Sequence, residues 1–325
     1  MPPVSTTADT PHADTRRIAF YAPKLGRRHF APRYWTTWLG LALMRALALM
    51  PLFVSRSIGC SLGLLMYAVN AKRRNIARVN LRLCFPALDE RARERLLRRH
   101  FCVFGQSFTD TAHLAWSSTR RLERMLQWRG LEAYREALRQ GRRVILLVPH
   151  LVGINFSGPM LGREHRTFCI IKPLRNEVID WFLNRTRLRF GGGTLTRDQG
   201  LRPALQALKQ GQTFHYSPDE DLGPERSVFV PFFGIPAATL PTLGRIAESA
   251  QAIVIPTFVR LLGFARGYEI VLYPPLDNFP LGDEMRDAAR MNEAIECGVR
   301  EMPEQYMWTF KFFKTRPNGA PAPYA

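Results

Sequence analysis

Short apolar runs alternate with helical patterns through the C-terminal two-thirds of the chain. The runs lie at residues 144–148, 167–171, 213–217, 252–259 and 268–272, and helical patterns at 177–190, 200–210 and 240–250 separate most of them. The first run, VILLV, is apolar at every position, which is typical of a strand buried on both faces. The alternation predicts an α/β layer fold with a largely buried sheet flanked by helices.

The chain carries a large surplus of positive charge. Its 325 residues include 46 Lys and Arg against 27 Asp and Glu, a formal net charge of +19. Such a surplus indicates an anionic partner: nucleic acid, an acidic membrane surface, a phosphorylated substrate or an acidic protein. The sequence has no helix-turn-helix, zinc-finger or RNP-like motif, and much of its basicity lies beside apolar segments. We therefore expect no nucleic-acid partner.

Five cysteines are scattered along the chain without a C-x-x-C pair. They are Cys60, Cys84, Cys102, Cys169 and Cys297. An odd, scattered set argues against a disulfide framework and against a structural zinc site, and it fits a reducing compartment. We therefore expect no structural metal.

An apolar segment near the N-terminus predicts attachment to a membrane. Residues 35–54 carry one formal charge, Arg45, and are numerous enough to cross a bilayer core of roughly 30 Å. Arg45 would be costly facing lipid, and Pro51 would kink the run. A tilted span, helices lying in the membrane interface and a buried helical hairpin of a soluble protein stay open, and we favour membrane association. The expected organisation is a poorly ordered basic head (1–34), a membrane-anchoring helical segment (35–86) and an α/β domain (87–325).

A histidine stands where an α/β sheet commonly binds its ligand. His150 follows Pro149 at the carboxyl end of the strand predicted at 144–148. A helix is predicted to start just beyond it, so backbone N–H groups would be available to an oxyanion. An imidazole there could deprotonate a hydroxyl or amine that attacks an activated acyl group. The sequence has no G-x-S-x-G elbow, which disfavours a serine hydrolase, and no P-loop.

Five motifs occur in the order and spacing of a known family. They are ARVNLRLCFP (77–86), LLVPHLVGIN (146–155), KPLRNEVIDW (172–181), YSPDEDLGPERSVFVPFFG (216–234) and PEQYMWTFKFFKTRP (303–317). With these motifs and the apolar N-terminal segment, the chain resembles the lipid A biosynthesis lauroyl/myristoyl acyltransferases. That family is a branch of the lysophospholipid and glycerol-3-phosphate acyltransferases. Each motif alone is weak evidence for the family, whereas the five motifs together are specific to it.

The resemblance implies a glycerol-3-phosphate acyltransferase-like fold with a mixed sheet. It implies an enzyme of the bacterial inner membrane whose catalytic domain faces the cytoplasm. The implied reaction moves a fatty acyl chain from acyl carrier protein to a hydroxyl of a phosphorylated glycolipid, a Kdo-bearing lipid A precursor, without a metal or organic cofactor. His150 would be the general base, and an Asp or Glu five positions later would orient the imidazole and stabilise its protonated form.

That acid position is Asn155 in this chain. An amide oxygen still accepts an imidazole N–H, but it brings no negative charge. Asn155 therefore indicates a weakened catalytic pair, lost activity, or a substitute carboxylate, for which Asp219 and Asp221 are the candidates. It could equally be a simple hydrogen-bonding residue at the start of a helix.

Further substrate-binding candidates come from the same motifs. They are Lys172, Arg175, Asn176, Asp219, Asp221, Lys311, Lys314 and Arg316. Lys172 stands where the family usually has Arg before Pro, and FKFFK at 310–314 replaces the usual His-Arg-Arg-Phe-Lys. The basic residues could contact phosphate or carboxylate, or they could belong to a basic surface tail. Asn176 could cap the helix predicted from residue 177 rather than touch substrate.

Three functions follow from these observations. The first is acyl transfer from acyl carrier protein to a lipid A precursor. The second is a diverged paralogue that acylates another lipid, an amine or a polyketide-like acceptor, because three motif positions depart from the family. The third is a catalytically weakened protein that binds lipid or carrier protein, because Asn155 replaces the acid.

Overall fold

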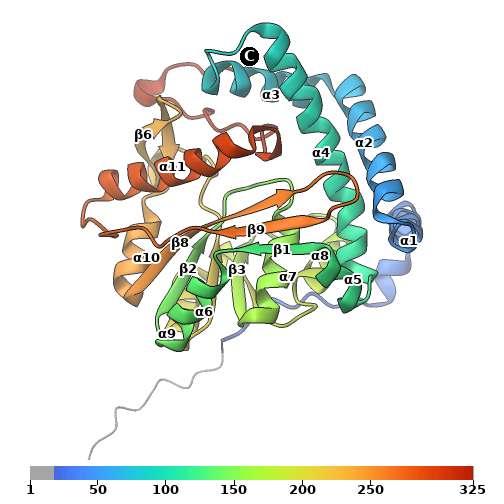
Figure 1. Cartoon of the computed structure of the whole chain (residues 1–325), viewed down its shortest axis with the longest axis horizontal. Coiled ribbons are helices and arrows are strands. Elements are labelled where there is room, and N and C mark those ends of the chain that lie inside the picture. Colours follow the sequence, from blue (N-terminus) through green and yellow to red (C-terminus); the bar gives the residue numbers. More distant parts are fainter. Residues whose placement is uncertain (1–17, 325) are drawn as a thin grey trace, which may run out of the picture.

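The computed structural model describes residues 18–324, so Arg16 and Arg17 of the expected basic head lie outside the described part (Figure 1). The strands are β1 (Leu126–Arg129), β2 (Arg143–Leu147), β3 (Thr167–Ile171), β4 (Gly193–Thr196), β5 (Thr213–Tyr216), β6 (Val228–Phe232), β7 (Ile235–Thr239), β8 (Ala252–Leu261) and β9 (Tyr268–Leu272). The α-helices are α1 (Trp35–Leu49), α2 (Leu52–Val69), α3 (Ala71–Cys84), α4 (Glu90–Trp116), α5 (Thr119–Arg124), α6 (Leu131–Arg139), α7 (Ile154–Glu164), α8 (Glu177–Arg187), α9 (Arg202–Lys209), α10 (Thr242–Ala250) and α11 (Glu284–Glu301).

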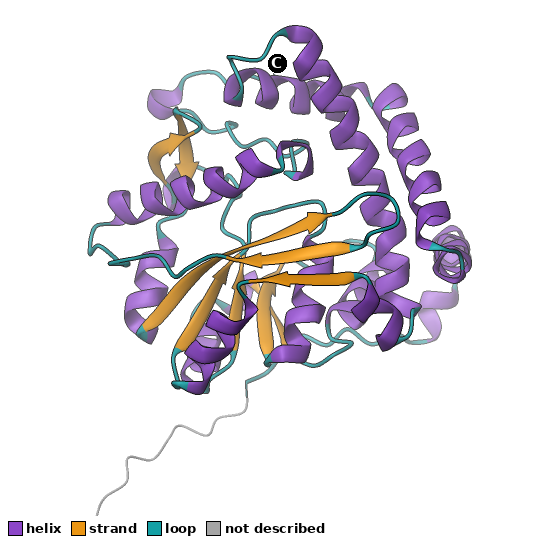
Figure 2. Ribbon diagram, viewed as in Figure 1, coloured by secondary structure: helices purple, strands orange, loops and turns teal. Residues whose placement is uncertain are grey.

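Seven strands form one mixed sheet in the order β1–β9–β8–β2–β5–β3–β4 (Figure 2). The five strands from β8 to β4 run parallel, whereas β9 is antiparallel to β8 and pairs in parallel with β1. The prediction of an α/β fold with a mixed sheet flanked by helices is confirmed. The first predicted strand is β2, whose residues Ile145 to Leu147 are fully buried. They are buried because β8 and β5 pair with β2 on its two sides and α6 and α9 pack against it.

Residues 18–21 lie against the edge of this sheet and residues 28–29 contact α1 and α8, although the sequence predicted a poorly ordered head over 1–34. The backbone N–H of Tyr21 donates to the carbonyl of Thr194 in the edge strand β4, with a distance of 2.7 Å. The ring of Phe20 lies on Gly193, where an added Cβ would come within 2.3 Å of the ring. Glycine is therefore required at the start of β4, because the N-terminal segment covers that strand closely.

The predicted apolar run at 35–54 folds as two helices rather than one. α1 ends at Leu49 and α2 begins at Leu52, with Met50 and Pro51 between them. Proline has no backbone N–H and cannot continue a helix, but it is accepted just before a new one begins. Among the described residues one helix, α2, is long and apolar enough to cross a bilayer, by length and composition alone.

α2 packs closely along α4 (Figure 1). A Cβ added to Gly63 would lie 1.9 Å from the carbonyl oxygen of Phe101, and one added to Gly105 would lie 2.0 Å from the carbonyl oxygen of Gly59. Only glycine allows two helix backbones to approach so closely. The two helices therefore behave as one packed unit.

A buried ion pair fastens α2 to the α/β domain. The guanidinium of Arg56 donates to both carboxylate oxygens of Asp110 on α4, at 2.9 to 3.2 Å, and both side chains are buried. Arg56 also donates to the carbonyls of Leu262, Gly263 and Gly267 in the β8–β9 turn. α2 is thus tied to the sheet as well as to α4.

The structure joins Cys60 of α2 to Cys102 of α4 by a disulfide, with Cα atoms 4.1 Å apart. The sequence argued against a disulfide framework, and this single bridge differs from that expectation. The close approach of the two helices at their glycines brings the cysteines together, whereas a separation of 42 residues in sequence gives no sign of it.

α1 and α2 lie at the edge of the molecule, away from the sheet (Figure 1). Many of their side chains are apolar and exposed. Exposed apolar side chains on α1, α2 and the adjoining part of α4 are Trp35, Leu39, Leu43, Leu49, Phe53, Ile58, Leu62, Leu64, Leu65, Val69 and Phe108. Only 22% of α2 is buried. The structure therefore differs from a buried helical hairpin of a soluble protein and leaves a large apolar surface uncovered, which we call the outer apolar face.

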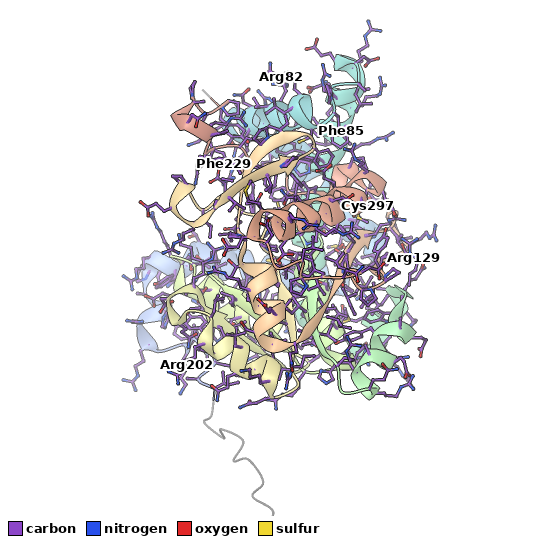
Figure 3. All side chains as sticks on the ribbon, turned by 90° about the vertical axis from the view of Figure 1, so that its left-hand side faces the viewer. Arg82, Phe85, Arg129, Arg202, Phe229 and Cys297 are labelled. Carbon is purple, nitrogen blue, oxygen red and sulfur yellow. A yellow bond between two sulfur atoms is a disulfide. The ribbon has the colours of Figure 1, made fainter. Side chains whose placement is uncertain are left out.

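A second layer covers the side of the molecule seen in Figure 3. There α11, which carries Cys297, lies beside the β6–β7 hairpin, which carries Phe229, and the end of α3 with Arg82 and Phe85 lies above them. The ring of Phe85 lies 5.7 Å from that of Trp308. This aromatic contact joins α3 to the C-terminal segment, and these two parts of the chain border the site described next.

Candidate active site

His150 and Asp219 lie side by side because they follow adjacent parallel strands. β2 and β5 pair in the sheet and end at the same edge, and the segments beyond them carry the two residues. Nδ1 of His150 lies 2.7 Å from Oδ1 of Asp219. Because a carboxylate only accepts, Nδ1 carries the proton and donates it, which leaves the lone pair of Nε2 free to act as a base.

Asp219 is itself held in place by two further donors. The backbone N–H of His150 donates to Oδ2 at 2.7 Å, and the hydroxyl of Tyr306 donates to the same oxygen at 2.9 Å. Burial, reinforced by the charge of Asp219, holds the pKa of Tyr306 well above its ordinary value, so the hydroxyl stays protonated and remains a donor. The carboxylate therefore fixes both the tautomer and the orientation of the imidazole.

The surroundings make His150 a stronger base than a free imidazole. Burial disfavours the charged ring, but the charge of Asp219, the hydrogen bond to it and the charge of Glu220 together raise the pKa of His150 above its ordinary value. A group that must take up a proton during a reaction benefits from such a shift.

Glu220 and Phe310 border the free nitrogen of the imidazole. Oε1 of Glu220 lies 3.4 Å from Nε2, and its other oxygen is paired with Nη2 of Arg197 at 2.6 Å. The ring of Phe310 lies 5.3 Å from the imidazole centre. A reacting hydroxyl would reach Nε2 between these two side chains.

Asn155 lies near the site without joining the pair. Among the described residues no hydrogen bond links it to His150, and its Oδ1 instead accepts from Nη2 of Arg187 at 3.5 Å. Asn155 stands in the first turn of α7, and Arg187 ends α8. Of the two substitute carboxylates proposed from the sequence, Asp219 contacts the imidazole. Asp221 instead accepts from the backbone N–H and the hydroxyl of Thr315.

A narrow cavity of about 390 Å³ runs from His150 beneath β3. It extends along β3 from Ile171 at the carboxyl end to Thr167 at the start, roughly 13 Å at about 3.3 Å per residue. Its walls are mainly apolar and include Ile154, Pro159, Phe168, Ile170, Leu183 and Leu188, and its polar members include Asn155, Lys172, Arg187 and Arg197. Its volume and mainly apolar lining suit a hydrocarbon chain.

A buried histidine in the same cavity has a different character. His215 shares a hydrogen bond with the fully buried hydroxyl of Ser157, at 2.9 Å between Nε2 and Oγ. Burial lowers the pKa of His215 to about 4, so the ring is neutral and compatible with an apolar lining. The serine hydroxyl is inaccessible, which agrees with the absence of a nucleophile elbow in the sequence.

A second cavity, which we call the wide cavity, has a larger volume of about 560 Å³ and is lined in part by Glu220 and Phe310, the two neighbours of His150. It lies between the first turn of α3 and the C-terminal segment, and Lys72, Arg73, Asp221, Lys311 and Lys314 line it. Glu220 and Phe310 line both cavities. These two side chains flank the imidazole and form a wall that both cavities share.

The other candidate residues divide between these cavities and the surface. Lys172 is exposed and belongs to the narrow cavity, and Lys311 and Lys314 belong to the wide one. Asn176 caps α8 by accepting from the N–H groups of Val178 and Ile179. Within residues 18–324, Arg175 and Arg316 line neither cavity, and Arg316 donates to the carbonyl of Pro236.

Several residues of the site were not singled out from the sequence. Arg197 and Glu220 follow β4 and β5 at the same sheet edge as His150. Their positions after predicted or possible strands could therefore have indicated both residues. Tyr306 and Phe310 come from a segment without helix or strand, and only the folded chain brings them to the imidazole. Within the described residues, no group of three or more His, Cys, Asp or Glu is arranged to hold a metal ion.

Comparison with known proteins gives the chemistry of this family. The family model of the bacterial lipid A biosynthesis acyltransferases matches residues 23–315. A lipid A biosynthesis acyltransferase of Haemophilus influenzae is 36% identical over 94% of this chain and 95% of its own length. A lipid A biosynthesis myristoyltransferase of Escherichia coli is 35% identical over 94% of each chain, and a lauroyltransferase of the same organism is 33% identical over 93% of this chain and 99% of its own. The chain therefore belongs to the bacterial lipid A biosynthesis acyltransferases and is an acyltransferase enzyme.

Proposed function

We propose that this enzyme transfers a fatty acyl chain from acyl carrier protein to a hydroxyl of a Kdo-bearing lipid A precursor at the bacterial inner membrane. His150 is the general base. The observation that carries the proposal is the His150–Asp219 pair, which lines an apolar cavity and is separated from an open, basic one by Glu220 and Phe310.

The proposed step needs one proton carrier and no covalent enzyme intermediate. Nε2 of His150 takes the proton of the acceptor hydroxyl while its oxygen attacks the thioester carbonyl. Arg187, beside Asn155 in the narrow cavity, stabilises the oxyanion that forms. The carbon–sulfur bond then breaks, the ester remains on the acceptor, and the imidazolium returns its proton to the departing thiolate of the carrier protein.

The narrow cavity is the proposed place of the acyl chain. Its apolar walls replace water around the chain, and its polar end at His150 leaves the thioester carbonyl next to the base. Lys172 and Arg175 are exposed near this end, between β3 and α8, and can attract an acidic carrier protein.

The outer apolar face supports membrane association. α1 and α2 expose large apolar side chains on one side of the molecule, while α2 is fastened to the α/β domain by Arg56. Such a face, with basic residues nearby, suits contact with an anionic bilayer. We propose that the catalytic domain lies on the cytoplasmic side, where acyl carrier protein is made.

The test is a transfer assay with purified protein in detergent. Acyl carrier proteins loaded with chains of different length are mixed with the lipid A precursor, and the product is measured by mass spectrometry. We expect acylated precursor from the natural protein and none above background from His150→Ala. Equal product from both proteins would refute the role of His150, and no product from either would refute the donor and acceptor.

A further inference from the structure

Among the described residues, three positive side chains in the wide cavity have no acidic partner. Lys72 and Arg73 come from α3, and Lys311 comes from the C-terminal segment. Within residues 18–324, none of the three forms an ion pair. Nη1 of Arg73 donates to the carbonyl of Thr309 at 2.9 Å, which holds the guanidinium between α3 and the C-terminal segment.

The acids of this cavity are already neutralised by other groups. Asp221 lies 3.8 Å from Nζ of Lys314 and accepts two hydrogen bonds from Thr315. Glu220 is paired with Arg197. The charge that remains for a ligand is therefore positive.

The start of α3 is unfavourable for the helix itself. Residues 72–74 are Lys-Arg-Arg, and the first turn has no acidic residue. In contrast, the first turn of α8 and the first turn of α11 each contain two acidic residues. Because the N-terminus of a helix carries partial positive charge, cations there lower helix stability, whereas a bound anion would compensate both charges.

The cavity also adjoins the outer apolar face. α2 ends at Val69, whose side chain is 72% exposed, and Asn70 and Lys72 of the cavity follow directly. A ligand with apolar chains and an anionic head could lay its chains along α2 and place its head in the cavity. A soluble anion would contact only the cationic residues of the cavity and would leave the outer apolar face uncovered.

We propose that this cavity binds the anionic sugar headgroup of the acceptor lipid, with Lys72, Arg73 and Lys311 contacting a phosphate monoester. The inference rests on the proposed function, because Phe310 and Glu220 place the cavity next to His150. Lys72 and Arg73 thus become acceptor-binding residues, and neither belongs to the motifs that pointed to the family.

Equilibrium binding to the inactive His150→Ala protein tests this proposal. The probes are the phosphorylated lipid A precursor in detergent micelles, the same lipid after phosphatase treatment, and inorganic phosphate. Adding Lys72→Ala and Arg73→Ala should weaken binding of the phosphorylated lipid at least about tenfold and leave the dephosphorylated lipid unchanged, since charge-assisted contacts are lost. Inorganic phosphate should compete only weakly, because it lacks the sugar and the chains.

The matched control removes two charges elsewhere. Arg82→Ala with Arg99→Ala changes two exposed arginines outside the cavity and should leave binding unchanged. Lys72→Glu keeps the hydrogen bond between Arg73 and Thr309 and should weaken binding of the phosphorylated lipid further. Circular dichroism checks that this variant is folded. Unchanged affinity in the Lys72/Arg73 variant, or competition by inorganic phosphate as strong as that by the lipid, would overturn the proposal. Because binding needs no turnover, charge-dependent binding without acyl transfer would refute the proposed function and still support this site.

Discussion

At the scale of residues, each nitrogen of His150 faces a carboxylate, and the two carboxylates have different roles. Asp219 accepts from Nδ1 and sets the tautomer, whereas Glu220 lies 3.4 Å from Nε2 and is shared with Arg197. Asp219 is therefore a positioning group. In the proposed reaction the acceptor hydroxyl approaches Nε2, which Glu220 borders, so the charge of Glu220 would act on the proposed base directly.

The pH dependence of acyl transfer should report the charge of Glu220. His150 must be neutral to act as a base, so the rate rises with pH through its pKa, which lies above the ordinary value. Removing a negative charge disfavours the protonated ring, so Glu220→Gln should move the acidic limb of the rate profile to lower pH. Glu225→Gln, an exposed acid in the same segment, should leave the limb in place. Identical profiles for both variants would contradict this assignment.

Restoring an acid at position 155 should not increase the rate. Asn155 contacts Arg187, and Asp219 already occupies the acid position of the pair. Asn155→Asp would pair with Arg187 and weaken its effect on the oxyanion, so we expect equal or lower turnover in the transfer assay. A rise of more than about tenfold would instead indicate that the natural pair is weakened, since general acid–base contributions are about 10²–10⁴.

The position of His150 could be predicted from the sequence, but its partner only as one of two candidates, Asp219 and Asp221. An apolar run that ends in Pro149 marks a strand end, and strand ends in α/β sheets bind ligands. The pairing with Asp219 depends on β5 lying next to β2, and strand order is not encoded in local pattern. The spacing of the family motif pointed to residue 155 instead.

At the scale of elements, the buried pair between α2 and α4 should control stability. Arg56→Leu leaves Asp110 buried without its partner, so we expect a loss of about 3–5 kcal/mol in the free energy of unfolding. Arg45→Leu on α1 makes the same change at an exposed position and should alter stability by less than about 0.5 kcal/mol. Chemical denaturation in detergent, followed by circular dichroism, measures both. Equal losses would show that the pair does not fasten α2.

The narrow cavity should set the length of the transferred chain. A Cβ added to Gly158 on α7 meets nothing closer than Cδ2 of His215, at 4.0 Å, so a larger side chain can enter the cavity. Gly158→Leu should lower the preference for longer over shorter acyl donors at least about tenfold. Gly40→Leu on α1, where an added Cβ meets no atom within 4 Å, is the control. An unchanged donor profile in Gly158→Leu would place the chain elsewhere.

Strands with a clear apolar run were predictable, including the four-residue β5, whereas β1 and β4 were not. The runs predicted at 144–148 and 268–272 are β2 and β9. β1 and β4 have four residues each, and β4 follows two glycines that indicate only a turn. The Cys60–Cys102 bridge depends on helix packing at glycines and has no local signal.

At the scale of the whole molecule, one surface should carry membrane binding. Leu43 on α1 and Leu65 on α2 are exposed on the outer apolar face. Replacing both with Asn should weaken binding to anionic vesicles at least about tenfold in a flotation assay, because each loses the benefit of apolar burial. Leu281→Asn with Met285→Asn, also exposed but at the start of α11, should have no effect. Equal binding by both double variants would locate membrane contact on another surface.

The central claim is that His150 and Asp219 work as a pair and that Asn155 is outside it. Acyl transfer to the lipid A precursor should be measured at saturating donor for the natural protein and for His150→Ala, Asp219→Asn and Asn155→Ala. We predict that the first two variants lose about 10²–10⁴ in kcat while Asn155→Ala keeps most of its rate. Natural turnover in Asp219→Asn, or loss in Asn155→Ala as large as in His150→Ala, would contradict the account.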